Sequence, residues 1–128
     1  MINDRVEVLI LKNLIFDETY CRRVLPFVKE EYFTDDVEKT LFLKISSFIL
    51  KYDSLPTKEA LLISVSNDDK LTEYVETALK EIITAFEPSV VEPNWLIEQT
   101  EEWCKDKAIY NALLNSIKIA DDKKSRFS

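Results

Sequence analysis

The chain contains no glycine among its 128 residues, although glycine makes up roughly 7% of an average protein. Without glycine, these residues hold no phosphate-binding loop, no glycine hairpin turn and no glycine at the end of a helix. Helices joined by proline, asparagine and aspartate corners tolerate this absence well. The composition therefore favours an all-α fold of four or more helices.

Histidine is absent as well, and there are only two cysteines, Cys21 and Cys104. The chain therefore has no imidazole base and no histidine metal ligand. Two cysteines are too few for a secreted disulfide scaffold, so we predict two reduced thiols in the core of an intracellular protein. No apolar run reaches the roughly 18 residues needed to span a membrane. We predict no catalytic, cofactor-binding or metal-binding residue and no membrane contact.

Acidic residues dominate one part of the sequence. Residues 68–102 hold ten carboxylates and two lysines, a net charge of −8, whereas the whole chain has a net charge of −7. Such a field repels nucleic-acid phosphate, so we expect no tight DNA binding. It would suit a basic protein partner, and a merely solubilising surface explains it equally well.

Two groups of residues near this segment could carry chemistry. Glu98, Glu101 and Glu102 lie near one another, but no histidine or second acidic helix converges on them as in a metal or acid–base site. We interpret them as a solvated face. Trp95 and Trp103 could stack on the bases of single-stranded DNA, but their acidic surroundings favour packing or a protein interface.

A long helix is predicted from about residue 34, with Thr34 at its start, to a Pro56-Thr57 corner. Apolar residues occupy two sides of it, and a helix of this kind is usually one that other helices surround. The main stripe is Val37, Leu41, Ile45, Phe48 and Tyr52, the opposite side is Leu43 and Leu50, and the polar strip is Thr40, Lys44, Ser47 and Lys51. We predict a structural pillar without partner contacts, because two lysines make only a weak basic patch.

Shorter helices are predicted on either side of this pillar. Their expected N-terminal caps are Asn3 or Asp4, Asp17, Thr57, the Asn67-Asp68-Asp69 turn, and Asn94. The fifth helix has an apolar half that includes Tyr74 and an acidic half that includes Glu73, Glu76 and Glu81. In the sixth, Leu96, Trp103, Tyr110 and Ile117 recur every seven residues, and the apolar surface then widens. A helix apolar nearly all round expects a second partner, so we predict concentration-dependent association.

Three stretches, taken in order, resemble the opening of DnaB-type replicative DNA helicases, in particular their T-even bacteriophage branch. They are residues 14–33 (LIFDETYCRRVLPFVKEEYF), residues 49–61 (ILKYDSLPTKEAL) and residues 101–112 (EEWCKDKAIYNA). The resemblance covers nearly the whole chain. Each motif consists of packing residues, so its weight lies in the order and spacing of the motifs.

The resemblance implies a helicase N-terminal domain, a compact bundle of about six helices. Residues 1–92 would form a globular head, residues 93–120 the first arm of a helical hairpin, and residues 121–128 a loop leading to the remainder of a longer chain. The second hairpin helix is absent, so contacts through the hairpin would be incomplete. In the family, ATP and Mg²⁺ belong to a C-terminal ATPase domain, and the N-terminal domains form a collar of a hexameric ring that docks DNA primase and, in some systems, a helicase loader.

Our leading hypothesis is therefore a non-catalytic domain of a phage replicative helicase, which supports hexamer assembly and primase docking in the cytoplasm of an infected bacterium. The alternatives are a small stand-alone phage protein that binds or mimics a replication factor, and a single-stranded DNA-binding module. The candidate protein interface comprises Glu73, Glu76, Glu81, Trp95, Trp103, Ile109, Tyr110, Leu113 and Ile117.

Overall fold

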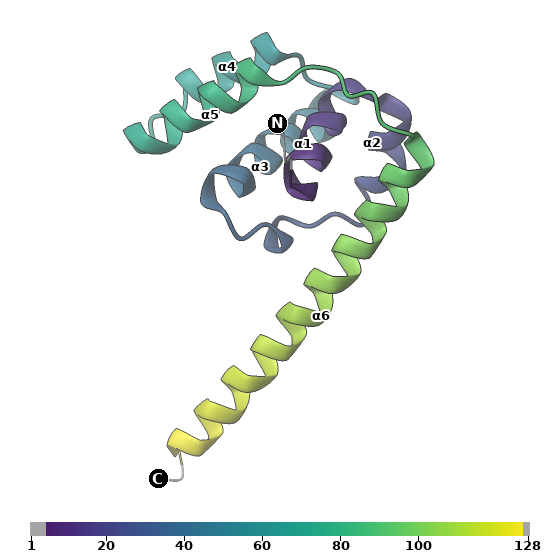
Figure 1. Ribbon diagram of the computed structural model, residues 1–128. Helices are drawn as coiled ribbons and strands as arrows, with labels where there is room; N and C mark the ends of the chain where they lie inside the picture. The colour runs from purple at the N-terminus through teal and green to yellow at the C-terminus, as the bar shows by residue number, and fades with distance from the viewer. Residues whose placement is uncertain (1–4, 127–128) are drawn as a thin grey trace.

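The computed structural model describes residues 5–126, which form helices and their connections (Figure 1). The elements are α1 (Val6–Phe16), α2 (Glu18–Val24), the 3-10 turn η1 (Glu30–Tyr32), α3 (Asp36–Tyr52), α4 (Lys58–Ser66), α5 (Glu73–Ala85) and α6 (Pro93–Arg126). No strand occurs within residues 5–126. The predicted all-α fold with six helices is confirmed.

Helix α3 lies at the centre of the packing, in contact with α1, α4, α5 and η1. Its main apolar stripe is buried at Leu41 and Ile45, whose side chains have no exposed surface. The prediction that other helices also cover its opposite side is wrong. Leu43 is 41% exposed and Leu50 is 85% exposed. The segment that follows α2 borders this side, but it leaves both leucines exposed.

Side-chain caps fix most of the helix starts. The Asp17 carboxylate accepts the Tyr20 N–H and begins α2, as predicted. Asp35 caps α3 by accepting the N–H groups of Val37 and Glu38, one residue later than the predicted start at Thr34. Asp35 rather than Thr34 is the cap, because its carboxylate accepts two N–H groups at the positive end of the helix dipole.

The other predicted caps have different outcomes. Thr72, rather than the predicted Asn67-Asp68-Asp69 turn, caps α5 by accepting the Val75 N–H. Thr57 caps α4 by accepting the Ala60 N–H, as predicted. Asn3 and Asp4, the predicted caps of the first helix, lie outside the described residues.

Helices α4 and α5 form an antiparallel pair on one side of α3 (Figure 1). Leu61 and Val65 of α4 and Leu79 and Ile83 of α5 are buried in this contact. Lys58, in the first turn of α4, donates hydrogen bonds to the carbonyl oxygens of Thr84 and Phe86. These carbonyls end α5 and have no helical N–H partner, so Lys58 ties the start of one helix to the end of the other.

Helix α6 begins at Pro93, a residue suited to the first position because it has no N–H to satisfy. The Glu92 carboxylate, rather than the predicted Asn94, accepts the Trp95 N–H at 2.7 Å. The first turns of α6 pack against α1, α2 and η1. Leu96, Thr100 and Cys104, four residues apart, form its buried stripe.

The rest of α6 extends away from the head as a single long helix (Figure 1). The predicted loop at residues 121–128 is wrong over its described part, because the helix continues to Arg126. No proline or glycine stops it, and Asp121 and Asp122 precede the basic residues by the spacing that supports a helix. The division into head and arm stays a prediction. Within residues 5–126, a search for a helix long and apolar enough to cross a membrane finds none.

Candidate protein-interaction surfaces

The outer face of α5 carries the predicted acidic residues. Glu73 and Glu81 are exposed, whereas Glu76 is half-buried and its carboxylate pairs with Lys80 Nζ at 3.2 Å. Tyr74, predicted for the apolar half of this helix, is instead 77% exposed. It lies at the edge of that half and in the first turn, away from the buried Leu79. The structure therefore adds an aromatic side chain to an acidic surface.

The outer part of α6 carries the predicted apolar residues. Ile109 and Tyr110 are each 53% exposed, and Leu113 and Ile117 are each 59% exposed. A hydrogen bond from this part of the helix to the head runs from Asn111 Nδ2 to the carbonyl oxygen of Glu31, at 3.2 Å. Apolar surface on this scale at successive turns is typical of a protein contact. The interface role of these residues stays a prediction.

The two tryptophans have different surroundings. Trp95 is 43% exposed at the start of α6. Trp103 is half-buried, with its ring centroid 6.0 Å from that of Tyr32 and 5.0 Å from that of Phe33. Its buried Nε1–H has no hydrogen-bond partner among the described residues. Trp103 thus packs α6 against the aromatic segment around η1, which belongs to the head.

The acidic group on α6 is open to solvent. Glu98, Glu101 and Glu102 are all exposed. Among the residues that the structure describes, no three cysteine or carboxylate side chains lie close enough to hold a metal ion.

Both cysteines are free and buried. Burial raises the pKa of the Cys21 thiol and of the Cys104 thiol from 9.0 to about 11, because a thiolate would lose its hydration there. The thiols are therefore neutral and poorly nucleophilic, and their predicted burial as core residues is confirmed.

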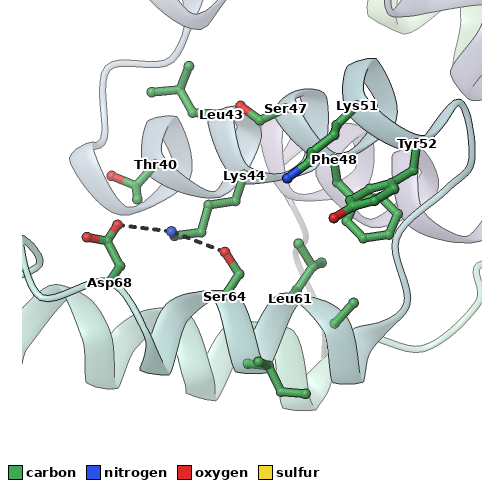
Figure 2. Close-up of a pocket in the computed structure, with 12 residues that line it drawn as sticks. Thr40, Leu43, Lys44, Ser47, Phe48, Lys51, Tyr52, Leu61, Ser64 and Asp68 are labelled. Carbon is green, nitrogen blue, oxygen red and sulfur yellow. Dashed lines mark hydrogen bonds and ion pairs between the residues drawn. The ribbon is translucent and has the colours of Figure 1, made fainter.

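A cleft between α3 and α4, with a volume of about 510 Å³, was not predicted from the sequence (Figure 2). At one end, Lys44 Nζ donates to Ser64 Oγ at 3.4 Å and pairs with the Asp68 carboxylate at 3.0 Å. The hydrogen bond from Lys44 holds the pKa of the Asp68 carboxyl below its usual value. Lys44 is consequently a structural tie between the two helices.

The other end of this cleft is aromatic. The ring centroids of Phe48 and Tyr52 lie 4.7 Å apart, and Lys51 Nζ lies 5.3 Å from the centre of the Tyr52 ring. Figure 2 shows these two rings side by side at this end of the cleft. Tyr52, predicted as part of the buried stripe, is 56% exposed because α3 ends at this residue. The cleft thus offers an apolar floor with a cation at its rim.

A second cleft lies on the other side of Leu43, between α3 and the segment that follows α2. Its volume is about 560 Å³, and its walls include Leu25, Pro26, Ile49 and Leu50. Leu43 also lines the first cleft, so the two hollows flank one ridge of α3. The clue in the sequence was the seven-residue spacing of Leu43 and Leu50, which we had assigned to helix packing inside the domain.

No protein-family model matches the chain. A similarity search does find a curated relative, the DnaB-like replicative helicase of Enterobacteria phage T4, which is 32% identical over 111 residues. The match covers 87% of this chain but only 23% of that protein. The chain thus spans less than a quarter of the relative's length, and this agrees with the resemblance that its ordered packing motifs predicted. It is a DnaB-like helicase N-terminal domain of the phage type.

Proposed function

We propose that this chain is the non-catalytic N-terminal domain of a phage replicative DNA helicase, and that it acts in DNA replication through protein contacts. The observation that carries the proposal is the identity with a replicative helicase over 87% of the chain. The chain lacks glycine, which a phosphate-binding loop requires. ATP and Mg²⁺ would therefore bind to another part of the helicase, and this domain would hold no cofactor.

The first proposed role is assembly of the helicase ring in the cytoplasm of the infected host. The exposed apolar side chains of outer α6, from Ile109 to Ile117, support this role because a single copy leaves them uncovered. Their natural neighbour would be another helical segment of a helicase subunit. In such a collar, the N-terminal heads of the subunits would lie next to one another, and the ATPase domain would be a separate part of each subunit.

The second proposed role is docking of the primase, and in some systems of a helicase loader. The acidic face of α5 supports it, because Glu73 and Glu81 are exposed and lie within a segment of net charge −8. A basic surface of a partner would be attracted to this face, with the largest effect on the association rate at low salt. Tyr74 would supply an aromatic contact at its edge.

The docking role is tested by titrating the chain with the primase of the same phage in an isothermal calorimeter. The variant Glu73→Lys/Glu81→Lys should weaken binding by about tenfold or more, because it replaces attraction by repulsion at the contact. The matched control Glu98→Lys/Glu101→Lys makes the same change of charge at exposed positions of α6, and it should change the affinity by less than about threefold.

Two results would contradict this assignment. If the chain does not bind primase, and loss of the domain does not affect primer synthesis by the full helicase, the docking role fails. If the two double variants weaken binding equally, the attraction depends on net charge alone and the α5 face is not the contact.

A further inference from the structure

The side of α3 that faces away from the core has the features of a docking surface. Leu43 and Leu50 project there, seven residues and therefore two helical turns apart, with the small side chains of Ser46 and Ser47 between them. A helix that lays leucines on both sides of such a ridge meets no bulky obstruction. Leu50, which is 85% exposed, and Leu43, which is 41% exposed, together make this ridge apolar.

The two clefts beside this ridge give it depth. The cleft toward α4 has a volume of about 510 Å³ and the cleft toward the end of α2 about 560 Å³, and Leu43 is a wall of both. The second cleft is walled largely by apolar side chains, among them Leu25 and Ile49. Apolar side chains of a docking helix could therefore enter on either side of the ridge.

Charge indicates the kind of partner. The charged residues that line the two clefts are four cations, Arg22, Lys29, Lys44 and Lys51, and two carboxylates, Glu30 and Asp68. This local excess of positive charge stands out in a chain of net charge −7. Arg22 and Lys44 are paired with Asp53 and Asp68.

Lys29 and Lys51, one at each cleft, take part in none of the ion pairs found among the described residues. We propose that the outer face of α3 binds an acidic amphipathic helix of a partner protein, with apolar side chains in the two clefts and carboxylates beside Lys29 and Lys51. This surface is distinct from the acidic α5 face and from outer α6, so it would serve a second partner of opposite charge. The outer part of α6 in a second copy is a poorer match, since Lys105, Lys107 and Lys118 alternate there with Asp106 and Asp121.

The test uses a synthetic 18-residue helical peptide as the probe, with leucines at seven-residue spacing and glutamates on both flanks. Leucine methyl groups of the full 128-residue chain are followed by NMR as the peptide is added. We expect the methyl signals of Leu43 and Leu50 to shift, and a sister peptide with lysine in place of every glutamate to bind about tenfold more weakly.

Variants locate the contact. Leu50→Glu should abolish the shifts, and because Leu50 is already exposed the fold should be retained. Val90→Glu, at a fully exposed position in the connection before α6, is the control and should leave binding unchanged. The double variant Lys29→Glu/Lys51→Glu should reverse the preference and bind the lysine peptide better.

Several outcomes would overturn the proposal. Equal binding of both peptides would show that charge does not select the partner, and shifts confined to outer α6 would place the contact elsewhere. Shifts of the Leu43 and Leu50 signals on raising the concentration of the chain alone would indicate a second copy as the occupant. The same shifts with a single-stranded oligonucleotide would indicate a nucleic acid. The result is independent of the primase titration. Primase binding that survives Leu50→Glu leaves the docking role intact, and peptide binding without primase binding leaves the α3 surface intact.

Discussion

A buried hydrogen bond between two side chains joins α2 to α6. The hydroxyls of Tyr20 in α2 and Thr100 in α6 lie 2.6 Å apart, and Thr100 Oγ1 also donates to the Leu96 carbonyl oxygen at 2.7 Å. Because the single hydroxyl proton of Thr100 goes to Leu96, Tyr20 must be the donor to Thr100. Burial raises the pKa of the Tyr20 phenol above its usual value.

This chain of donors predicts unequal effects of two substitutions. Tyr20→Phe leaves Thr100 bonded to Leu96, so we expect a loss of about 1 kcal/mol in the free energy of unfolding. Thr100→Val leaves the Tyr20 hydroxyl buried without an acceptor and should cost about 1–3 kcal/mol. The double variant should cost clearly less than the sum, as measured by urea unfolding followed by circular dichroism. Strict additivity would show that the two hydroxyls do not interact.

The two buried thiols predict a loss of stability at alkaline pH. Below about pH 9, Cys21 and Cys104 are protonated in both the folded and the unfolded chain, so their contribution is constant. Above it, the unfolded chain releases protons first, because burial raises the folded pKa of each thiol to about 11. The free energy of unfolding should fall by on the order of 2 kcal/mol or more between about pH 9 and pH 11.

The control for this effect is Cys21→Ala/Cys104→Ala. This variant should be less stable at pH 7 because it loses buried atoms, but its free energy of unfolding should change less over the same pH range. Equal pH dependence in the two proteins would show that other groups, such as Tyr20, cause the alkaline loss.

At the scale of elements, α3 and α6 are alike in having more apolar surface than one chain covers. The inner face of α3 and the first turns of α6 build the core of the head, with Leu41 and Leu96 almost fully buried. The outer face of α3 and the outer part of α6 remain exposed. Each element therefore has a structural half and a half that is available to a partner.

Exposed apolar residues on outer α6 predict that the chain associates as its concentration rises. The weight-average mass in sedimentation velocity should increase over the micromolar range, and Leu113→Asp/Ile117→Asp should abolish the increase by placing charge on the contact. The fold should survive, because both side chains are more than half exposed. Leu50→Asp, an exposed leucine on α3, should not prevent association. A strict monomer at high concentration would refute the prediction.

The sequence predicted the helices well because the determinants are local. Asp17 and Thr57 each cap a helix where a hydroxyl or carboxylate meets the start of a periodic run. The sequence could not tell which apolar side of α3 would be covered, because that depends on where α4 and α5 pack. Leu50 and Tyr74 were therefore assigned to contacts that the chain does not make. The predicted loop after residue 120 failed because charged residues without proline or glycine can continue a helix.

For the whole molecule, the central result is a helicase-type N-terminal domain with three separate exposed surfaces. The acidic face of α5, the apolar surface of outer α6 and the clefted face of α3 are carried by different helices. Because they differ in charge and in apolar content, they could engage different partners at the same time. These surfaces could be predicted from the sequence only in part. The periodicity of a helix is a local property, whereas the exposure of its side chains depends on how all the helices pack.

The docking role is tested in the full helicase of which this chain is proposed to be the N-terminal domain. Primer synthesis by its primase and DNA-stimulated ATP hydrolysis are compared for the native protein and for Glu73→Lys/Glu81→Lys. If the domain acts by docking and takes no part in catalysis, primer synthesis should fall by about tenfold or more while ATP hydrolysis stays within about twofold. Unchanged primer synthesis, or an equal loss of both activities, would contradict the account.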